Sequence, residues 1–105
     1  MLETTDIQLS QLHDTTKQCL DDGYRFVTIS CVELDAERVD LIYHFDKDVQ
    51  LAHYRLTVPK AGELPSISDI YMAAFLVENE LQDQFGLVFA GLVVDFGQTL
   101  LTEEN

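Results

Sequence analysis

Apolar residues recur along this chain at two different periods, and the changes of period mark the expected elements. Between residues 6 and 22 apolar and small side chains fall three or four positions apart, which predicts a helix with Asp6 as its cap. Gly23 follows where helices commonly end in a left-handed residue. The stripe expected to face the core comprises Leu9, Leu12, Thr16, Cys19 and Leu20.

Strand-like alternation replaces this spacing after the first helix. The stretches 24–32, 39–45 and 51–58 are rich in aromatic and β-branched residues, and the middle stretch has one strongly apolar face. The turns between these stretches are too short for helical crossovers, so we expect an antiparallel meander. A polar connector, residues 59–65, follows the third strand.

The clearest helical pattern spans residues 66–85. Ser66 and Asp69 have the spacing of a capping box, and Gly86 is placed to end the helix. Residues 87–94 are apolar and predict a strand with a bulge or a close contact at Gly91. The helical stripe consists of Ile67, Ile70, Ala74, Val77, Leu81 and Phe85.

Length and composition favour one folded domain. The 105 residues offer too little apolar area for two cores, and 47% hydrophobic with 24% charged residues argues against disorder. The order α-β-β-β-α-β therefore predicts a single α+β domain over residues 1–105. We expect a mixed, mostly antiparallel sheet with both helices packed on one face, and an acidic tail at 97–105.

The charge of the chain restricts its partners. Acidic residues outnumber basic residues 19 to 6, for a net charge of −13, which disfavours nucleic acid and anionic membranes. A basic protein surface fits this charge, and a solvated acidic surface explains it equally well. No apolar stretch approaches the roughly 20 residues of a membrane span, and the start lacks signal-peptide features, so we expect a cytoplasmic protein.

Few groups suggest a metal site. Cys19 and Cys31 lack the spacing of metal or iron–sulfur ligands and are expected to be small core residues. His13, His44 and His53 lack zinc-like spacing. His44 and His53 lie on adjacent expected strands and can approach each other, and we interpret them as an exposed cross-strand pair rather than a metal site.

The carboxylates of the second helix are candidates for an acid–base or metal centre. Glu80 and Asp83 share a face, whereas Glu78 points about 200° away from Glu80, so the three cannot converge from one helix. A polar face of an amphipathic helix accounts for them. The sequence also has no phosphate-binding glycine loop and no nucleophile elbow. The residues thus offer no catalytic constellation, and we expect no cofactor and no metal.

Residues 65–91 carry a more specific pattern. Glu78 and Glu80 are followed by Asp83 and then by Phe85-Gly86 and a short apolar strand. This pattern resembles the C subunit of NADH–quinone oxidoreductase (respiratory complex I) and its small homologues in energy-converting, membrane-bound nickel–iron hydrogenases. Two departures stand out. Asn79 stands where the family usually has Arg, which removes an ion pair, and the family's His-Pro and Arg-Arg-Ile-Leu-like segment is absent after Gly91.

The resemblance implies a non-catalytic accessory subunit without a cofactor of its own. Its implied partners are the catalytic large subunit and the iron–sulfur subunits of the parent complex, with the inner face of the cell membrane reached only through that complex. Phe85 would anchor the helix end in the core, Gly86 would permit the chain reversal, and the carboxylates would cap or pair with neighbouring groups. The motif and interface residues are Glu78, Glu80, Asp83, Phe85, Gly86 and Gly91.

Other functions stay open at this point. An acidic adaptor or inhibitor would bind a basic protein surface unrelated to electron transfer. A small enzyme would use Glu78, Glu80 and Asp83 as acid–base or metal groups. The sequence is compatible with a complex I-like or a hydrogenase parent complex, and with a homo-oligomer of the isolated chain.

Overall fold

Three long strands form the main sheet. β2 (Arg25–Glu33), β3 (Arg38–Lys47) and β4 (Gln50–Pro59) are joined by hairpins, and the antiparallel meander expected from the sequence is confirmed. β1 (Thr5–Asp6) pairs in parallel with the outer edge of β4, giving the strand order β1-β4-β3-β2. The computed structural model describes residues 3–91 of the chain.

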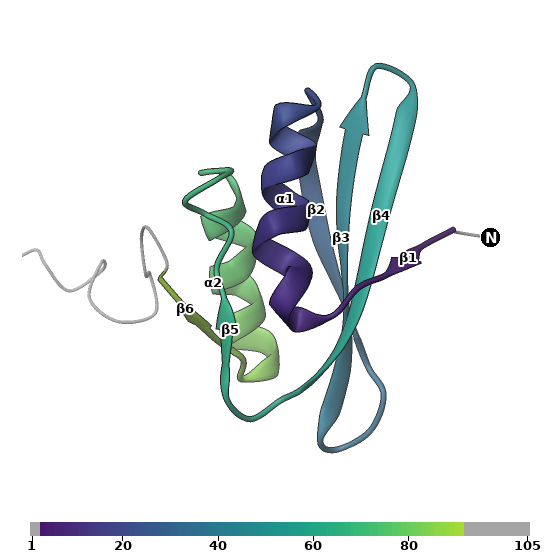
Figure 1. Ribbon diagram of the computed structural model, residues 1–105. Coiled ribbons are helices and arrows are strands. Elements are labelled where there is room, and N and C mark those ends of the chain that lie inside the picture. Colours follow the sequence, from purple (N-terminus) through teal and green to yellow (C-terminus); the bar gives the residue numbers. More distant parts are fainter. Residues whose placement is uncertain (1–2, 92–105) are drawn as a thin grey trace, which may run out of the picture.

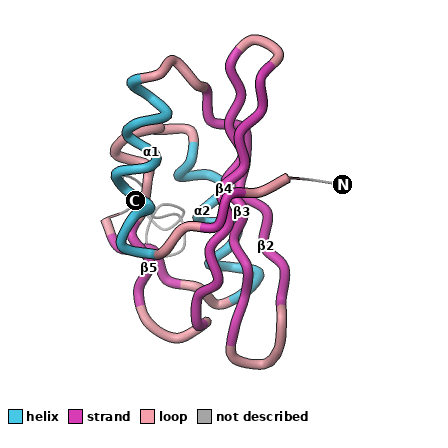
Figure 2. Tube along the Cα trace, turned by 45° about the vertical axis from the view of Figure 1, so that its right-hand side comes forward, coloured by secondary structure: helices cyan, strands magenta, loops and turns pink. Residues whose placement is uncertain are grey.

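Both helices lie on the same face of this sheet (Figure 1). They are α1 (Leu12–Asp21), preceded by the 3-10 turn η1 (Leu9–Gln11), and α2 (Ala74–Phe85). Figure 2, turned by 45°, shows α1 to one side of the strands. β5 (Glu63–Pro65) and β6 (Val88–Ala90), before and after α2, form a second, parallel pair. The expected α+β domain with a mixed, mostly antiparallel sheet is therefore confirmed.

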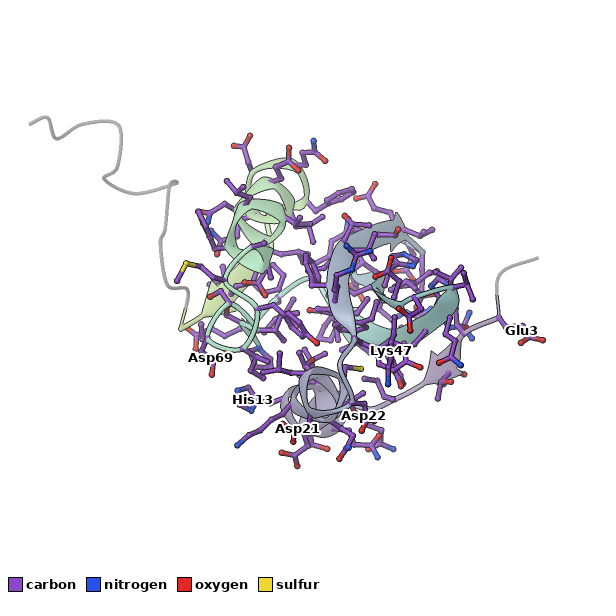
Figure 3. The ribbon with its side chains drawn as sticks, turned by 90° about the horizontal axis from the view of Figure 1, so that it is seen from above. Glu3, His13, Asp21, Asp22, Lys47 and Asp69 are labelled. Atoms are coloured by element: carbon purple, nitrogen blue, oxygen red, sulfur yellow. The ribbon has the colours of Figure 1, made fainter. Side chains whose placement is uncertain are left out.

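The core fills the layer between the helices and the sheet (Figure 3). Phe45 is 1% exposed, and its ring lies among those of Phe26, Tyr54 and Tyr71, with centroid separations of 6.1, 6.1 and 5.6 Å. Alternate β3 side chains point into this layer, because successive residues of a strand face opposite sides. The buried β3 residues are Val39, Leu41, Tyr43 and Phe45.

The end of α1 follows the sequence expectation. Gly23 has φ +89°, and its N–H donates to the Leu20 carbonyl at 3.0 Å. The Tyr24 N–H donates to the Cys19 carbonyl at 2.9 Å, which completes a Schellman motif. This arrangement satisfies carbonyls at the helix end and turns the chain into β2.

The start of α1 is a correction. Asp6 lies in β1 and does not cap the helix, which begins at Leu12 after η1. The Asp6 carboxylate instead accepts a hydrogen bond from Arg55 Nε at 2.9 Å. A contact with a strand 49 positions away has thus replaced the local cap.

The expected start of the second helix is also wrong. Residues 66–73 form turns, with the N–H groups of Ile70 and Tyr71 both donating to the Ile67 carbonyl, and α2 begins at Ala74. Ser66 is only 6% exposed and its hydroxyl donates to Glu78, so it is not available as a cap. The polar connector expected at 59–65 contains the short strand β5.

Gly91 lies at the end of the described residues. It follows β6 with φ +80°, and a Cβ at this position would meet no atom of residues 3–91 within 4 Å, so the expected close contact is not formed with this part of the chain. The left-handed backbone is what favours glycine here. The rest of the expected strand at 92–94 and the acidic tail at 97–105 lie outside the described residues.

Alanine substitutions of Phe45 and Phe85 should show which of the two rings lies in the centre of the core and which lies at its edge. Phe45→Ala should cost about 3–5 kcal/mol of unfolding free energy, the range for a fully buried aromatic. Phe85, expected in the core, is only half-buried against it, so Phe85→Ala should cost at least about 1 kcal/mol less. Urea unfolding of both variants measures the difference. Equal losses would contradict this assignment of the core.

Candidate functional site

The three motif carboxylates of α2 do not share one surface. Glu78 is 0% exposed, whereas Glu80 and Asp83 are both exposed. The expectation that Glu78 points away from Glu80 is therefore confirmed. An acid–base centre that joins all three carboxylates does not form.

Glu78 occupies a core position of α2. It lies on the same buried stripe as Ala74 and Leu81, four residues after one and three before the other. The Ser66 hydroxyl donates to Glu78 Oε1 at 2.6 Å, and the Ile67 N–H donates to Oε2 at 2.9 Å. The helix therefore presents its carboxylate to the turn segment that precedes it. The i, i+4, i+7 spacing was the signal in the sequence that could have placed Glu78 inside.

Two neighbours of Glu78 complete this interior polar cluster. Ser68 Oγ lies 2.7 Å from Ser66 Oγ, and the Ser68 N–H donates to Ser66 Oγ at 3.0 Å. The Tyr43 hydroxyl is buried and has no hydrogen-bond partner among residues 3–91. Burial, followed by the negative charge of Glu78, raises the pKa of Tyr43.

The environment of Glu78 places its titration near neutral pH. Burial raises the pKa of Glu78 to about 7, against the lowering effect of the hydrogen bonds from Ser66 and Ile67. The charge of Asp69 raises it further. The motif thus holds a titratable group in the interior, where it supports the fold and does not face solvent.

The remaining motif residues shape the end of α2. Gly86 has φ +71° and donates its N–H to the Gln82 carbonyl at 3.0 Å, so its expected role as the helix stop is confirmed. Gln82 Oε1 accepts the Phe89 N–H at 2.9 Å and ties β6 to the helix. Asn79, at the family's arginine position, is 8% exposed and donates from Nδ2 to the Phe75 carbonyl at 2.7 Å.

The outer side of α2 and the turn before it form a mixed surface, here called the α2 surface: Met72, Leu76, Glu80 and Asp83. Met72 is 66% and Leu76 55% exposed. Neither Glu80 nor Asp83 forms an ion pair with another described residue. Four of the six basic residues are already paired with carboxylates elsewhere, so the negative charge of the α2 surface is not neutralised.

The histidines separate into a pair and a single residue. His44 and His53 pair across β3 and β4 with their Nδ1 atoms 2.7 Å apart, so their expected approach is confirmed. The expectation that they are exposed is wrong, because both side chains are half-buried. Ser30 Oγ lies 2.8 Å from His44 Nε2, a contact that sequence reasoning missed although alternation along β2 could have suggested it. His13 of α1 instead contacts Asp69 in the turn before α2, with Nε2 and Oδ2 2.9 Å apart (Figure 3).

The described residues contain neither a cluster of metal ligands nor a helix that could span a membrane. Residues 3–91 contain no group of three or more His, Cys, Asp or Glu side chains that could hold a metal ion. Over the same range, no helix combines the length and the apolar composition that a membrane span requires.

Substitution of Glu78 should remove a pH dependence of stability. The folded-state pKa, about 7, lies above the ordinary value of 4.5. The carboxyl's contribution to stability is therefore fully present below about pH 4.5 and is lost as pH rises through about 7. The linked change is about 3 kcal/mol. Urea unfolding of the wild type and of Glu78→Gln between pH 4.5 and 8 measures it.

Glu80→Gln is the matched control, because it removes an exposed carboxylate from the same helix and retains Glu78. It should keep the wild-type pH dependence. A constant difference in unfolding free energy between wild type and Glu78→Gln over this range would show that Glu78 is not perturbed.

Comparison with known proteins identifies the family of this chain. Residues 5–104 match the family described as respiratory-chain NADH dehydrogenase, 30 Kd subunit. The C subunit of NADH-quinone oxidoreductase from Ruegeria pomeroyi is 34% identical over 90 residues, covering 73% of this chain and 45% of that protein. The chain thus spans about half the length of this curated relative.

A solved structure shares the fold. A chain of the membrane-bound sulfane sulfur reductase, an archaeal respiratory membrane complex, matches with a TM-score of 0.78 at 19% identity. The match covers 97% of this chain and 66% of that one. Because the family match includes nearly the whole sequence and a curated C subunit is 34% identical to it, this chain belongs to the respiratory-chain NADH dehydrogenase 30 Kd subunit family, which includes the C subunit of NADH-quinone oxidoreductase.

Proposed function

We propose that this chain is a non-catalytic accessory subunit of a membrane-associated redox complex and docks on the catalytic large subunit. The observation that carries the proposal is that the three motif carboxylates of α2 are divided between the interior and the surface. Glu78 is enclosed and bound by Ser66 and Ile67, whereas Glu80 and Asp83 face outward. Such a motif shapes a helix from inside and offers contacts outside, and it gathers no reactive groups.

The α2 surface is the proposed docking surface. Its two exposed apolar side chains can be buried by a partner, and its two unpaired carboxylates complement a basic or mixed surface. Gly86 and the contact between Gln82 and Phe89 fix the end of this helix, so the surface is held in one shape before docking. A pre-shaped surface loses less conformational entropy on binding.

The parent assembly is proposed from the relatives. One is a subunit of NADH-quinone oxidoreductase and another belongs to an archaeal respiratory membrane complex. We infer that the electron carriers are bound by other chains, including iron–sulfur subunits. The chain would then lie at the cytoplasmic side of the membrane through its partners. The second candidate, an acidic adaptor for an unrelated basic protein, is favoured by the net charge of −13 alone.

A paired substitution tests the docking surface. Leu76→Asp on α2 and Leu51→Asp on β4 each place a charge at an exposed leucine, 55% and 67% exposed, so both variants should fold. The tagged full-length chain should retain the catalytic large subunit and cluster-bearing chains after gentle extraction of the native membrane fraction. Leu51→Asp should retain them as well, and Leu76→Asp should reduce their recovery at least tenfold, as quantified by mass spectrometry.

Two results would contradict the proposal. Recovery of the wild type as a free monomer, with none of these chains enriched, would argue against an accessory subunit. Binding to an unrelated basic protein that is abolished at about 0.5 M salt would support the adaptor, since exposed charges are then screened within a few ångströms.

A further inference from the structure

The sheet face turned away from the helices, here called the open face, carries a chain of polar contacts across three strands. The side chains of His53 on β4, His44 on β3 and Ser30 on β2 form a row across the strands. The two Nδ1 atoms are 2.7 Å apart, and His44 Nε2 lies 2.8 Å from Ser30 Oγ. All three side chains are half-buried. The imidazole rings, whose centroids are 4.9 Å apart, are therefore held by their neighbours.

The short contact between the two Nδ1 atoms requires a proton on one of them. Two imidazole nitrogens at 2.7 Å cannot both present lone pairs without repulsion, so one must carry a proton. The unprotonated nitrogen of a neutral imidazole has a lone pair that can bind a metal ion. If both Nδ1 atoms become unprotonated, a metal ion can lie beside the line that joins them, once the two rings turn so that both lone pairs point toward the ion.

Ser30 is placed to select the required form of His44. When His44 carries its proton on Nε2, it donates to Ser30 Oγ and leaves the Nδ1 lone pair directed toward His53. Metal-binding histidines commonly donate their second ring N–H to such a partner, which fixes the tautomer and the ring orientation. His53 needs only to move its proton to Nε2, so neutral rings bind a metal without net loss of a proton.

We propose that His44 and His53 form a two-nitrogen chelating site for a divalent transition-metal ion of the Cu(II) or Ni(II) type, with Ser30 as a positioning residue. Two nitrogens in adjacent positions of a tetragonal ion are about 2.9 Å apart, and in a tetrahedral ion about 3.3 Å, for bonds of about 2.0–2.1 Å. The observed 2.7 Å is closer to the tetragonal value. Imidazole nitrogen also suits both ions.

The surroundings leave the remaining coordination positions accessible. His53 borders a surface hollow of about 930 Å³, which is also lined by Glu3 and Thr5. Water in this hollow can therefore complete the coordination. The negative charge of the whole chain favours a divalent cation over an anion at this surface.

Calorimetric titration of the full chain with Ni(II), which does not oxidise the free cysteines, tests the site. One ion should bind per chain, and His44→Gln and His53→Gln should each lower the affinity at least tenfold. His13→Gln is the matched control and should bind as the wild type, because His13 contacts Asp69 at a separate place. Ser30→Ala should weaken binding roughly tenfold, the lower range for loss of an orienting partner.

Electron paramagnetic resonance with Cu(II) supplies a readout that a change of stability would not mimic. The wild type should show coupling to two imidazole nitrogens, and each single histidine variant should show coupling to one. Wild-type affinity in His53→Gln, or coupling to only one nitrogen in the wild type, would overturn the proposal. Circular dichroism of each variant confirms that a lost signal does not come from unfolding.

Discussion

The buried carboxylate of Glu78 is the interaction on which the C-terminal half of the described structure depends. A carboxylate removed from water costs several kcal/mol unless polar partners surround it. Ser66 and the Ile67 N–H supply these partners, and both lie in the segment between β5 and α2. This segment must therefore fold back on the helix that it leads into. The pairing of β5 with β6 follows, because both flanks of α2 are brought to the same side.

The burial of Glu78 also explains why one motif carboxylate lies inside the molecule and the other two lie on its surface. A helix fixed from its inner side by Glu78, and at its end by Gly86, has little freedom to rotate or shift, so its outer residues keep a constant position. The proposed use of Glu80 and Asp83 as contact groups depends on this fixed position. The family pattern thus combines an interior residue and exterior residues that a linear motif does not distinguish.

The predictable parts of the fold were those set by local chemistry. Alternating residues predicted the three long strands, and Gly23 and Gly86 predicted the helix ends, because a left-handed position favours glycine wherever it occurs. The helix starts were missed because distant contacts decided them: Asp6 pairs with Arg55, and Ser66 binds Glu78. β1 and β5 span only two and three residues and exist through pairing with remote strands, so no periodic pattern marks them.

Alternation along β3 also determines how the two polar sites relate. Tyr43 points into the core, where the charge of Glu78 acts on it, and His44, the next residue, points to the open face toward His53. The α2 surface and the histidine pair therefore lie on opposite sides of the sheet. The proposed docking and the proposed metal binding consequently involve separate residues, so each can be tested by substitutions that leave the other set of residues intact.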